Sequence, residues 1–469
     1  MDLTHGIVFT PQSVSQPKSN PYRVLDDPSI KYVRIYWVDW TNLRRCRIVP
    51  IAHFKALLAS NRPGVNVAKV LLGFVYLQVA PLFSEMGEYL YAIDMDTLRP
   101  CPWAPGHWAV LGRFEEKAPI GTLSVITVDL CPRTILRRIT DTIKHEYGTD
   151  FIIGFESEFI LLSSQQPVTA SNLHHFAASA ALFAGSREAI VLEEIADAVT
   201  ASGIKLEMIH AEAAPGQYEV VVGPLTPVEA ADAFIHTNEI IAQVAAKHGL
   251  HATFAPRPFM HSIGSSAHAH LSVHSAEDKV GGRLAIREAQ FLAGVLEHLR
   301  GIVALTLPTS ASYKRVGDGV WSGGTYVCYG TENREAPVRL TNIASPGSRN
   351  FELRFIDGTA NPHLALAAIL AGGLLGFKKA MELTTLDCPG PKSAAQLSDA
   401  ERATLGINKR LPLSAEEGRT SLESDNELSG ILGKEFVQKY LSVNRLLDSL
   451  LVPQGETEEE QLTRLVKYY

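Results

Sequence analysis

The sequence contains the stretch Gly154-Phe155-Glu156-Ser157-Glu158-Phe159, in which two glutamates stand between phenylalanines and precede the apolar run Ile160–Leu162. In a β-strand residues i and i+2 share one face, so Glu156 and Glu158 project together. Like charges on one buried face cost several kcal/mol per ion unless cations compensate them. The stretch therefore predicts a buried strand that holds cations.

Three further segments carry acids or imidazoles in an apolar frame. They contain Glu212 and Glu219, the doublet His268-Ala269-His270, and Glu352 between Phe351 and Leu353. A single glutamate usually lies on a solvated face, and a single histidine is usually a hydrogen-bonded core residue. The combination is different, because glutamates with an imidazole are ligands for divalent ions such as Mg²⁺ or Mn²⁺. It predicts a site for more than one metal ion.

The composition limits the class of protein. The chain has 469 residues, of which 46% are hydrophobic, which predicts a large core divided between two domains. A net charge of −7 gives no electrostatic reason to expect nucleic acid or an anionic membrane as a partner. Five scattered cysteines without C-x-x-C spacing favour reduced thiols in an intracellular compartment.

No signal peptide or membrane span is evident in the sequence. The chain begins without a basic start and a long apolar stretch. The most apolar run, Leu364–Phe377, has 14 residues, whereas a membrane-spanning helix needs roughly 20. The run therefore predicts a buried core helix, and we expect a cytoplasmic protein without a membrane partner.

The pattern along the chain predicts three parts. Residues 1–29 are rich in proline and serine and are expected to form a flexible tail. Residues 30–118 are expected to form a small α+β domain that begins with a half-buried strand near Val33. Residues 119–469 are expected to form a larger domain, in which the acidic segments lie on strands of one mixed or antiparallel sheet with helices packed behind it.

Four arginines come from segments that are expected to converge on this sheet. Arginines beside divalent metals are the equipment of phosphoryl transfer, because guanidinium groups neutralise the charge that develops on phosphate oxygens. Neither a G-x-x-x-x-G-K-[ST] nor a G-x-G-x-x-G motif occurs, so metals and arginines rather than a glycine-rich loop are expected to hold a nucleotide. The alternative for each arginine is surface solvation. The four residues are Arg315, Arg334, Arg339 and Arg354.

These segments, in this order and spacing, resemble the glutamine synthetase family. The resemblance covers about residues 31–450 and is most specific in the larger domain. It implies an α+β fold with an N-terminal β-grasp domain, followed by a catalytic domain with a curved mixed or antiparallel sheet backed by helices. The matching motifs are Gly154–Phe159, Glu212–Glu219, Gly264–Ser272, Ser312–Arg315, Glu332–Arg339 and Phe351–Pro362.

The resemblance also implies ligand sets for Mg²⁺ or Mn²⁺, with two or three ions in the site. One ion, which orients the acceptor carboxylate, would be held by Glu158, Glu212 and Glu219. A second ion, which bridges the phosphates of ATP, would be held by Glu156, His268 and Glu352. The remaining matched positions contact ATP and the transferred phosphate (His270, Ser272, Arg334 and Arg339) or the glutamate substrate (Arg315 and Arg354), and Gly264 and Trp321 are further candidates for the substrate site.

The family reaction runs in two steps. The side-chain carboxylate of glutamate takes the γ-phosphoryl group of ATP, and ammonia then displaces phosphate. The departures from the family pattern gather where ammonia would bind. No Asp or Glu occurs from Thr41 to Ser84, and Trp321 stands where the family's flap carries a glutamate base. Asp318 is the candidate for a substitute base.

Three hypotheses follow. The first is an ATP-dependent γ-glutamyl ligase that joins glutamate, or an analogue, to an organic amine. An apolar pocket with Trp321 and Tyr76 suits the body of such an amine. The second is a glutamine synthetase with a displaced base that uses ammonia. The third is a regulatory or structural homologue of low activity, like the synthetase-like halves of fungal developmental proteins. The resemblance further implies self-association into rings, as a decamer or dodecamer.

Overall fold

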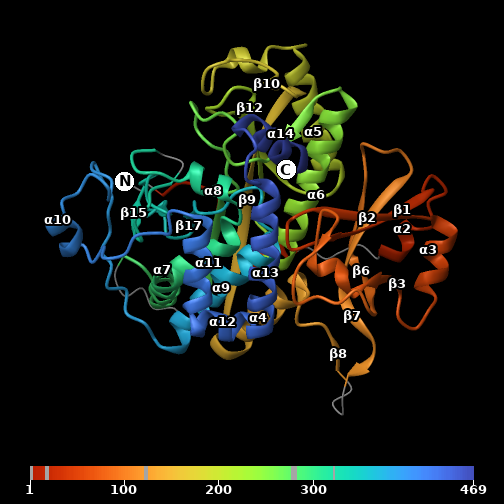
Figure 1. Ribbon diagram of the computed structural model, residues 1–469, viewed down its shortest axis with the longest axis horizontal. Coiled ribbons are helices and arrows are strands. Elements are labelled where there is room, and N and C mark those ends of the chain that lie inside the picture. The colour runs from red at the N-terminus through yellow and green to blue at the C-terminus, as the bar shows by residue number, and fades with distance from the viewer. Residues whose placement is uncertain (1–3, 16–20, 121–124, 276–282, 321–322) are drawn as a thin grey trace.

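The computed structural model describes residues 4–15, 21–120, 125–275, 283–320 and 323–469. Two sheets dominate it, one of six strands and one of nine, and most helices pack on the larger sheet (Figure 1). Each sheet combines antiparallel pairs with one parallel pair. The α+β class with mixed sheets is confirmed.

The smaller sheet comes from the N-terminal quarter of the chain. Its strand order is β2-β1-β7-β6-β3, and β8 pairs with β7. On β1 the alternating residues Val33, Ile35 and Trp37 are buried, as the sequence pattern predicts, but Tyr36 and Val38 on the opposite face are buried as well, so the strand is more than half-buried. The strands are β1 (Tyr32–Val38), β2 (Arg44–Pro50), β3 (Gly64–Ala68), β6 (Glu88–Pro100), β7 (His107–Ile120) and β8 (Val125–Thr127).

A helix and a short hairpin complete this part of the chain. Helix α3 (Ile51–Leu58) follows β2, and a 3₁₀ turn at Lys69–Gly73 leads into the hairpin β4 (Phe74–Val75) and β5 (Gln78–Val79). Since β8 still belongs to the smaller sheet, we propose that the boundary between the domains follows Thr127 and not residue 118.

The larger sheet is built around β9, a strand of 17 residues. Its order is β11-β12-β9-β14-β17-β16-β15, and β10 and β13 also pair with β9. All the segments that carry predicted metal ligands thus meet in one sheet. The strands are β9 (Thr149–Gln165), β10 (Val168–Ala170), β11 (Leu206–Ala211), β12 (Gln217–Val222), β13 (His251–Thr253), β14 (Ala269–Ser275), β15 (Tyr329–Thr331), β16 (Val338–Thr341) and β17 (Asn350–Leu353).

Helices pack against this sheet and against one another. The most buried is α9 (Pro362–Lys378), whose residues 362–377 are all buried, so the predicted core helix is confirmed. Within the described residues, no helix combines the length and apolarity that a membrane span requires. The longer helices are α4 (Pro132–Tyr147), α5 (Arg187–Ala201), α6 (Pro227–Lys247), α7 (Ile286–Thr306) and α13 (Lys434–Leu451), and the shorter ones are α8 (Ser310–Arg315), α10 (Asp399–Thr404), α11 (Ala415–Ser424), α12 (Asn426–Leu432) and α14 (Glu458–Tyr468).

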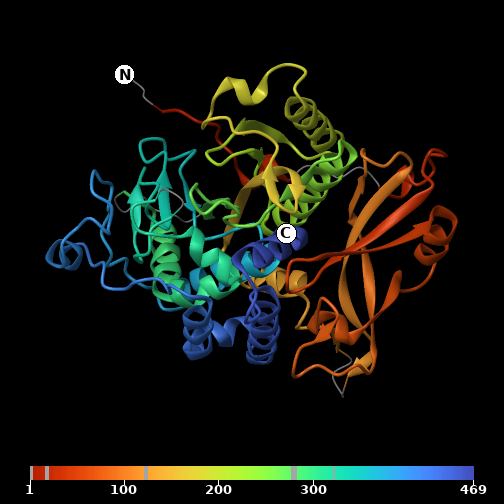
Figure 2. The same cartoon turned by 45° about the horizontal axis from the view of Figure 1, so that its top comes forward.

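The two ends of the chain connect the sheets. The N-terminal segment begins beside the larger sheet, on the side remote from the smaller one, and its two short helices are α1 (Pro11–Val14) and α2 (Pro21–Val24) (Figure 2). At the other end the Tyr469 hydroxyl donates to the main-chain oxygen of Thr41 at 2.7 Å. The ring of Tyr468 stacks on Tyr76 with centroids 3.9 Å apart. The last residues therefore hold the β4–β5 hairpin against the larger domain.

Candidate active site

Cross-strand register places three polar residues in one row of the larger sheet. His210 on β11 pairs with Glu219 on β12, and Glu219 pairs with Glu158 on β9. Side chains that lie directly opposite in an antiparallel pair have Cβ atoms about 5 Å apart. The row therefore brings an imidazole and two carboxylates together on one face.

A second row lies on the other side of β9. His270 on β14 pairs with Glu352 on β17, and Glu352 pairs with Arg339 on β16. On β9 the partner of His270 is Gly154, and Glu156 lies two residues along the same face, where its main-chain N–H donates to the oxygen of His268 at 3.0 Å. The register thus accounts for a second group of acids and imidazoles, this time with an arginine beside it.

The second row forms the group that we call the Glu352 cluster (Glu156, His270 and Glu352), whose ligand atoms lie within 4.8 Å of one another. His270 Nε2 lies 2.9 Å from Glu156 Oε1. His268 Nδ1 lies 2.9 Å from Glu156 Oε2 and 3.5 Å from Glu352 Oε1. Both predicted imidazoles therefore reach this cluster.

Two arginines compensate the charge of the Glu352 cluster. Glu352 is 2% exposed, and its Oε2 accepts a hydrogen bond from Arg339 at 2.8 Å. Its Oε1 accepts one from Arg354. Because a buried carboxylate is costly without a cation, these two ion pairs make the burial of Glu352 possible.

The pKa shifts in the Glu352 cluster reflect this compensation. Burial opposes the charge of Glu156, but His270 and His268 outweigh it and hold the pKa of Glu156 well below its usual range. Burial also opposes the charge of Glu352, yet Arg354 and the imidazoles lower its pKa. The charge of Glu156 overcomes burial at His270 and raises its pKa to about 9. The neighbouring cations thus favour the ionised form of both carboxylates.

Two residues of the first row, His210 and Glu219, form a group with Glu212 that we call the Glu219 cluster. The ligand atoms of these three residues lie within 4.8 Å of one another. His210 Nε2 lies 3.1 Å from Glu219 Oε1, and His210 Nδ1 lies 3.6 Å from Glu212 Oε1. Glu158 lies opposite Glu219 and accepts hydrogen bonds from Gln217 Nε2 at 2.9 Å and from the main chain of Ser266 at 3.0 Å.

The carboxyl groups around the Glu219 cluster have raised pKa values. Burial, followed by the charges of Glu219 and Glu212, raises the pKa of Glu158 to about 8. Burial raises the pKa of Glu219 to about 7 although His210 opposes the shift. The hydrogen bond that His210 donates to Glu219 raises the pKa of His210 to about 9. The acids here repel one another, and His210 is the cation that pairs with Glu219.

These residues fit divalent metal ions. Several carboxylate oxygens converge on each cluster, and such oxygens are preferred ligands of Mg²⁺ and Mn²⁺. His268 Nε2 is buried and has no hydrogen-bond partner among the described residues. Burial, with Arg354 nearby, lowers the pKa of His268 to about 4, so its imidazole is neutral. A neutral buried imidazole whose second nitrogen has no hydrogen-bond partner has the lone pair that a metal ligand needs.

Comparison with known proteins decides the family. The family model described as "Glutamine synthetase, catalytic domain" matches residues 129–448. The chain belongs to the glutamine synthetase family. The larger sheet and both clusters lie within the matched residues, apart from the ends of the chain that pack on them.

Two relatives and one solved structure illustrate the similarity. The chain is 36% identical to Protein fluG of Emericella nidulans, and the match covers 90% of this chain but 47% of that protein. It is 31% identical to the gamma-glutamylpolyamine synthetase GlnA3 of Streptomyces coelicolor, over 88% of each. It superposes on a GmaS/ADP complex with a TM-score of 0.77 and 25% identity, over 96% of this chain and 100% of the other. The chain thus spans about half the length of fluG.

The glutamine synthetase motif at Tyr313–Arg315 places Arg315 beneath the site. Its side chain is 0% exposed and donates to the main-chain oxygens of Arg354 and Ile356 at 3.0 and 3.3 Å. A Cβ at Gly264 would lie 2.4 Å from Arg315 Cγ, so only glycine permits this approach. The predicted substrate residues Gly264, Arg315 and Arg354 are therefore neighbours.

The structure separates the other predicted residues of this glutamine synthetase homologue. Arg334 is exposed in the loop between β15 and β16, and its charge acts on Glu212. Asp318 forms an ion pair with Arg410 and accepts a hydrogen bond from Thr325. As a base it would have to leave Arg410. Trp321 lies outside the described residues.

Sequence reasoning missed His210 and Gln217. The signal for His210 was present, since His210 and Glu212 stand two residues apart and share one face of a strand. Gln217 gave no such signal, because its amide reaches Glu158 only through the register between β12 and β9. These two side chains orient carboxylates that the glutamine synthetase motifs identify.

A cavity of about 360 Å³ opens beside the Glu352 cluster. Its lining includes the polar Glu156, Glu207, His270 and Ser272 and the apolar Val222 and Pro224. A lining with both polar and apolar groups suits a nucleotide, which has a charged phosphate part and a flat base. Of the residues predicted to contact ATP, His270 and Ser272 lie here.

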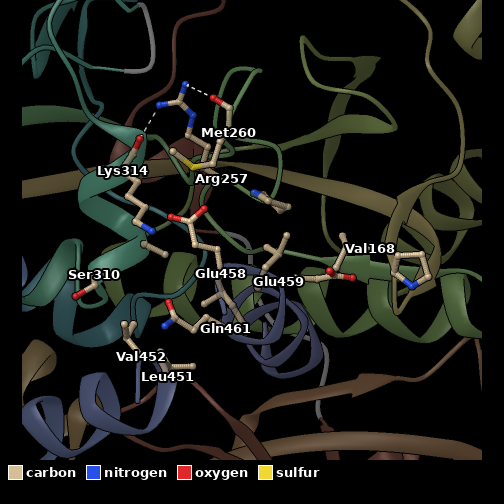
Figure 3. Close-up of a pocket in the computed structure, with 15 residues that line it drawn as sticks. Val168, Arg257, Met260, Ser310, Lys314, Leu451, Val452, Glu458, Glu459 and Gln461 are labelled. Carbon is tan, nitrogen blue, oxygen red and sulfur yellow. Dashed lines mark hydrogen bonds between the residues drawn. The ribbon is translucent and has the colours of Figure 1, made fainter. Parts of the chain in front are cut away.

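A separate, more apolar cavity of about 330 Å³ lies between α8, α14 and β10 (Figure 3). Arg257 borders it and donates to the main-chain oxygens of Lys314 at 2.7 Å and Met260 at 3.0 Å. None of the six predicted metal ligands lines this cavity. We therefore assign the chemistry to the two clusters, where the titratable groups converge.

Proposed function

We propose that this protein is an ATP-dependent ligase that activates the side-chain carboxylate of glutamate, or of a close analogue, and couples it to an amine. The observation that carries the proposal is the pair of carboxylate clusters on one sheet, with Arg339 and Arg354 at one of them and a nucleotide-sized cavity beside it. Two cation sites next to guanidinium groups are the apparatus of phosphoryl transfer.

The first step would form an acyl phosphate. An oxygen of the glutamate side-chain carboxylate attacks the γ-phosphorus of ATP, the bond between the β,γ-bridging oxygen and the γ-phosphorus breaks, and ADP leaves. Arg334 and Arg339 would pair with oxygens of the transferred phosphoryl group, whose charge is spread over three equatorial oxygens in the transition state. Arg315 and Arg354, beside Gly264, are 0% and 3% exposed, so each would have to leave its present contacts to orient the substrate carboxylate.

The two clusters would hold Mg²⁺ or Mn²⁺. Glu156, His268, His270 and Glu352 surround one position, and Glu158, Glu212 and Glu219 with His210 surround the other. When bound, such ions neutralise phosphate charge and orient both reactants. Gln217 and Ser266 keep the Glu158 carboxylate in place through their hydrogen bonds to both of its oxygens.

The second step would be attack of the amine nitrogen on the acyl carbon, with loss of phosphate and of one proton from nitrogen. We propose an organic amine because the β4–β5 hairpin presents no carboxylate that would bind ammonium. Its tip carries Tyr76, stacked on Tyr468, and Leu77, which is 90% exposed. Gamma-glutamylpolyamine synthetase among the relatives supports this nucleophile class.

Phosphate release from ATP tests the proposal. The purified protein is assayed with Mg²⁺ or Mn²⁺ and glutamate, with ammonia or with each member of a panel of primary amines. Turnover with one amine well above ammonia supports the proposal and names the substrate. Turnover with ammonia alone would make the protein a glutamine synthetase with a displaced base. No turnover with bound metal would leave a regulatory homologue.

We also propose self-association into a ring, in the cytoplasm. The hairpin tip exposes Leu77, and the loop after the hairpin exposes Leu82 and Met86, at 90%, 63% and 80%. Exposed apolar side chains on one loop are typical of an interface. Light scattering would detect a decamer or dodecamer, and a monomer at micromolar concentration would exclude the ring. The five free cysteines support the cytoplasmic location.

A further inference from the structure

The N-terminal segment is tied to the loop that precedes β17. The main-chain N–H of His5 donates to Ser345 Oγ at 2.9 Å, and Ser348 Oγ donates to the main-chain oxygen of His5 at 2.6 Å. Gly6 has a φ of +86°, and a Cβ there would lie 2.8 Å from Ser348 Oγ. Glycine is thus required where the segment crosses the loop.

The other end of the segment is held at the start of β11. Lys205 Nζ lies 4.5 Å from the centre of the Phe9 ring, which is a cation–π contact. The segment from His5 to Phe9 therefore has an anchor at each end, and both anchors belong to the larger domain. The stretch between them has a fixed position over the sheet.

Between the anchors, Ile7 and Phe9 line the cavity beside the Glu352 cluster. The lining also includes Ile152, Val222 and Pro224, of which Ile152 and Val222 are 1% and 4% exposed. Ile7 is 64% exposed, although an apolar side chain gains from burial. An exposed isoleucine in a cavity with apolar lining residues offers one side of a slot for a flat apolar group.

The same loop connects the segment with the polar end of the cavity. Asn350 Nδ2 donates to the main-chain oxygen of Ser348 at 3.2 Å, and Asn350 Oδ1 lies 2.8 Å from His270 Nδ1. His270 in turn contacts Glu156. A chain of hydrogen bonds thus runs from Ser348, which holds the segment, through Asn350 to His270 and Glu156.

We propose that Ile7 and Phe9 form one wall of the nucleotide site and hold the purine base of ATP against Val222 and Pro224. The phosphates then extend toward Ser272, His270 and Glu156. This inference rests on the proposed use of ATP. It makes the segment of residues 5–9 a determinant of nucleotide affinity, although it lies far from the other site residues in the sequence.

The test separates the base from the phosphates. Binding of a non-hydrolysable ATP analogue and of inorganic tripolyphosphate, each with Mg²⁺, is measured by calorimetry. The double variant Ile7→Ser/Phe9→Ser should weaken binding of the analogue about tenfold to a hundredfold and leave tripolyphosphate binding unchanged. Val8→Ser is the matched control, because Val8 lies in the same segment but lines only the neighbouring cavity. It should bind both ligands as the parent protein does.

A second variant displaces the segment without changing the cavity side chains. Gly6→Val places a side chain against Ser348 and should weaken analogue binding to a similar extent. Unchanged or tighter analogue binding in the double variant would overturn the inference, since tighter binding would mean that the segment blocks the site. Equal weakening for both ligands would also overturn it. A parent protein that binds neither ligand would overturn the proposed function as well.

Discussion

The Glu352 and Glu219 clusters contain the same kinds of side chain and differ in charge balance. In the Glu352 cluster, Arg339 and Arg354 pair with the buried carboxylate and the pKa values of both acids are lowered. In the Glu219 cluster, His210 is the imidazole that contacts the acids, and the pKa of Glu219 is raised to about 7. The acids of the first cluster are paired with protein cations, whereas burial and mutual repulsion favour the protonated form of the acids in the second.

Removing the carboxylate of the Glu352 cluster should have the largest effect. Glu352→Gln leaves Arg339 and Arg354 without their buried partner, which we expect to destabilise the protein by about 3–5 kcal/mol. Urea unfolding of the metal-free protein measures the change. The control is Glu332→Gln, which removes the half-exposed partner of Arg339 and should cost less than about 1 kcal/mol. Equal losses of stability in the two variants would show that burial does not strengthen the ion pairs of Glu352 over that of Glu332.

The corresponding change in the Glu219 cluster should affect activity and spare stability. Glu219→Gln relieves repulsion between acids but also removes the partner of His210, so the stability of the metal-free protein should change by no more than about 1 kcal/mol. In the assay with the amine that supports turnover, kcat should fall by about 10²–10³-fold. Loss of one electrostatic contact to a transition state has an effect of this size. Glu193→Gln, at an exposed position on α5, is the control. A large loss of stability in Glu219→Gln would contradict the contrast between the clusters.

The pH dependence of stability should separate the clusters. The raised pKa values of Glu219 and Glu158, about 7 and 8, mean that the folded state keeps protons which the unfolded state loses above about 4.5. This contribution to the stability of the metal-free protein is full below pH 4.5 and is lost as the pH rises to about 8. The lowered pKa values of Glu156 and Glu352 act oppositely, and their contribution is lost as the pH falls below 4.5.

Thermal unfolding at several pH values, with and without Mn²⁺, measures how the stability changes with pH. The melting temperature of the metal-free protein should fall between pH 5 and 8, and saturating Mn²⁺ should remove or reverse that fall because the ion replaces the protons. The same slope with and without metal would mean that the Glu219 cluster is not a metal site.

The smallest effect is expected at His210. Its pKa is raised to about 9, so its contribution to stability is full below pH 6.5 and is lost as the pH rises through 9. His210→Gln should cost about 1 kcal/mol or less at pH 6, because the imidazole is partly exposed, and nothing above pH 9. Urea unfolding at the two pH values tests this, and a pH-independent loss would indicate packing and not charge.

The sequence predicted the residues of the site better than their partners. The alternation around Glu156 and Glu158 is a local property of one strand, so the shared face follows from spacing alone. The contact of His210 with Glu219, and of Gln217 with Glu158, depends on which strands are neighbours and in which register. A proline- and serine-rich composition gave no reason to expect the contacts of His5 and Phe9 with the larger domain.

The sequence by itself determined the family and the α+β class, and it predicted which acids share a strand face, because motif spacing and strand periodicity are local. Only the tertiary structure decided how charge is shared among them. Arg339 faces Glu352 across a strand pair, while Glu158 faces Glu219. Coulombic interactions depend on distance and burial, and both are set by strand register and not by position in the chain.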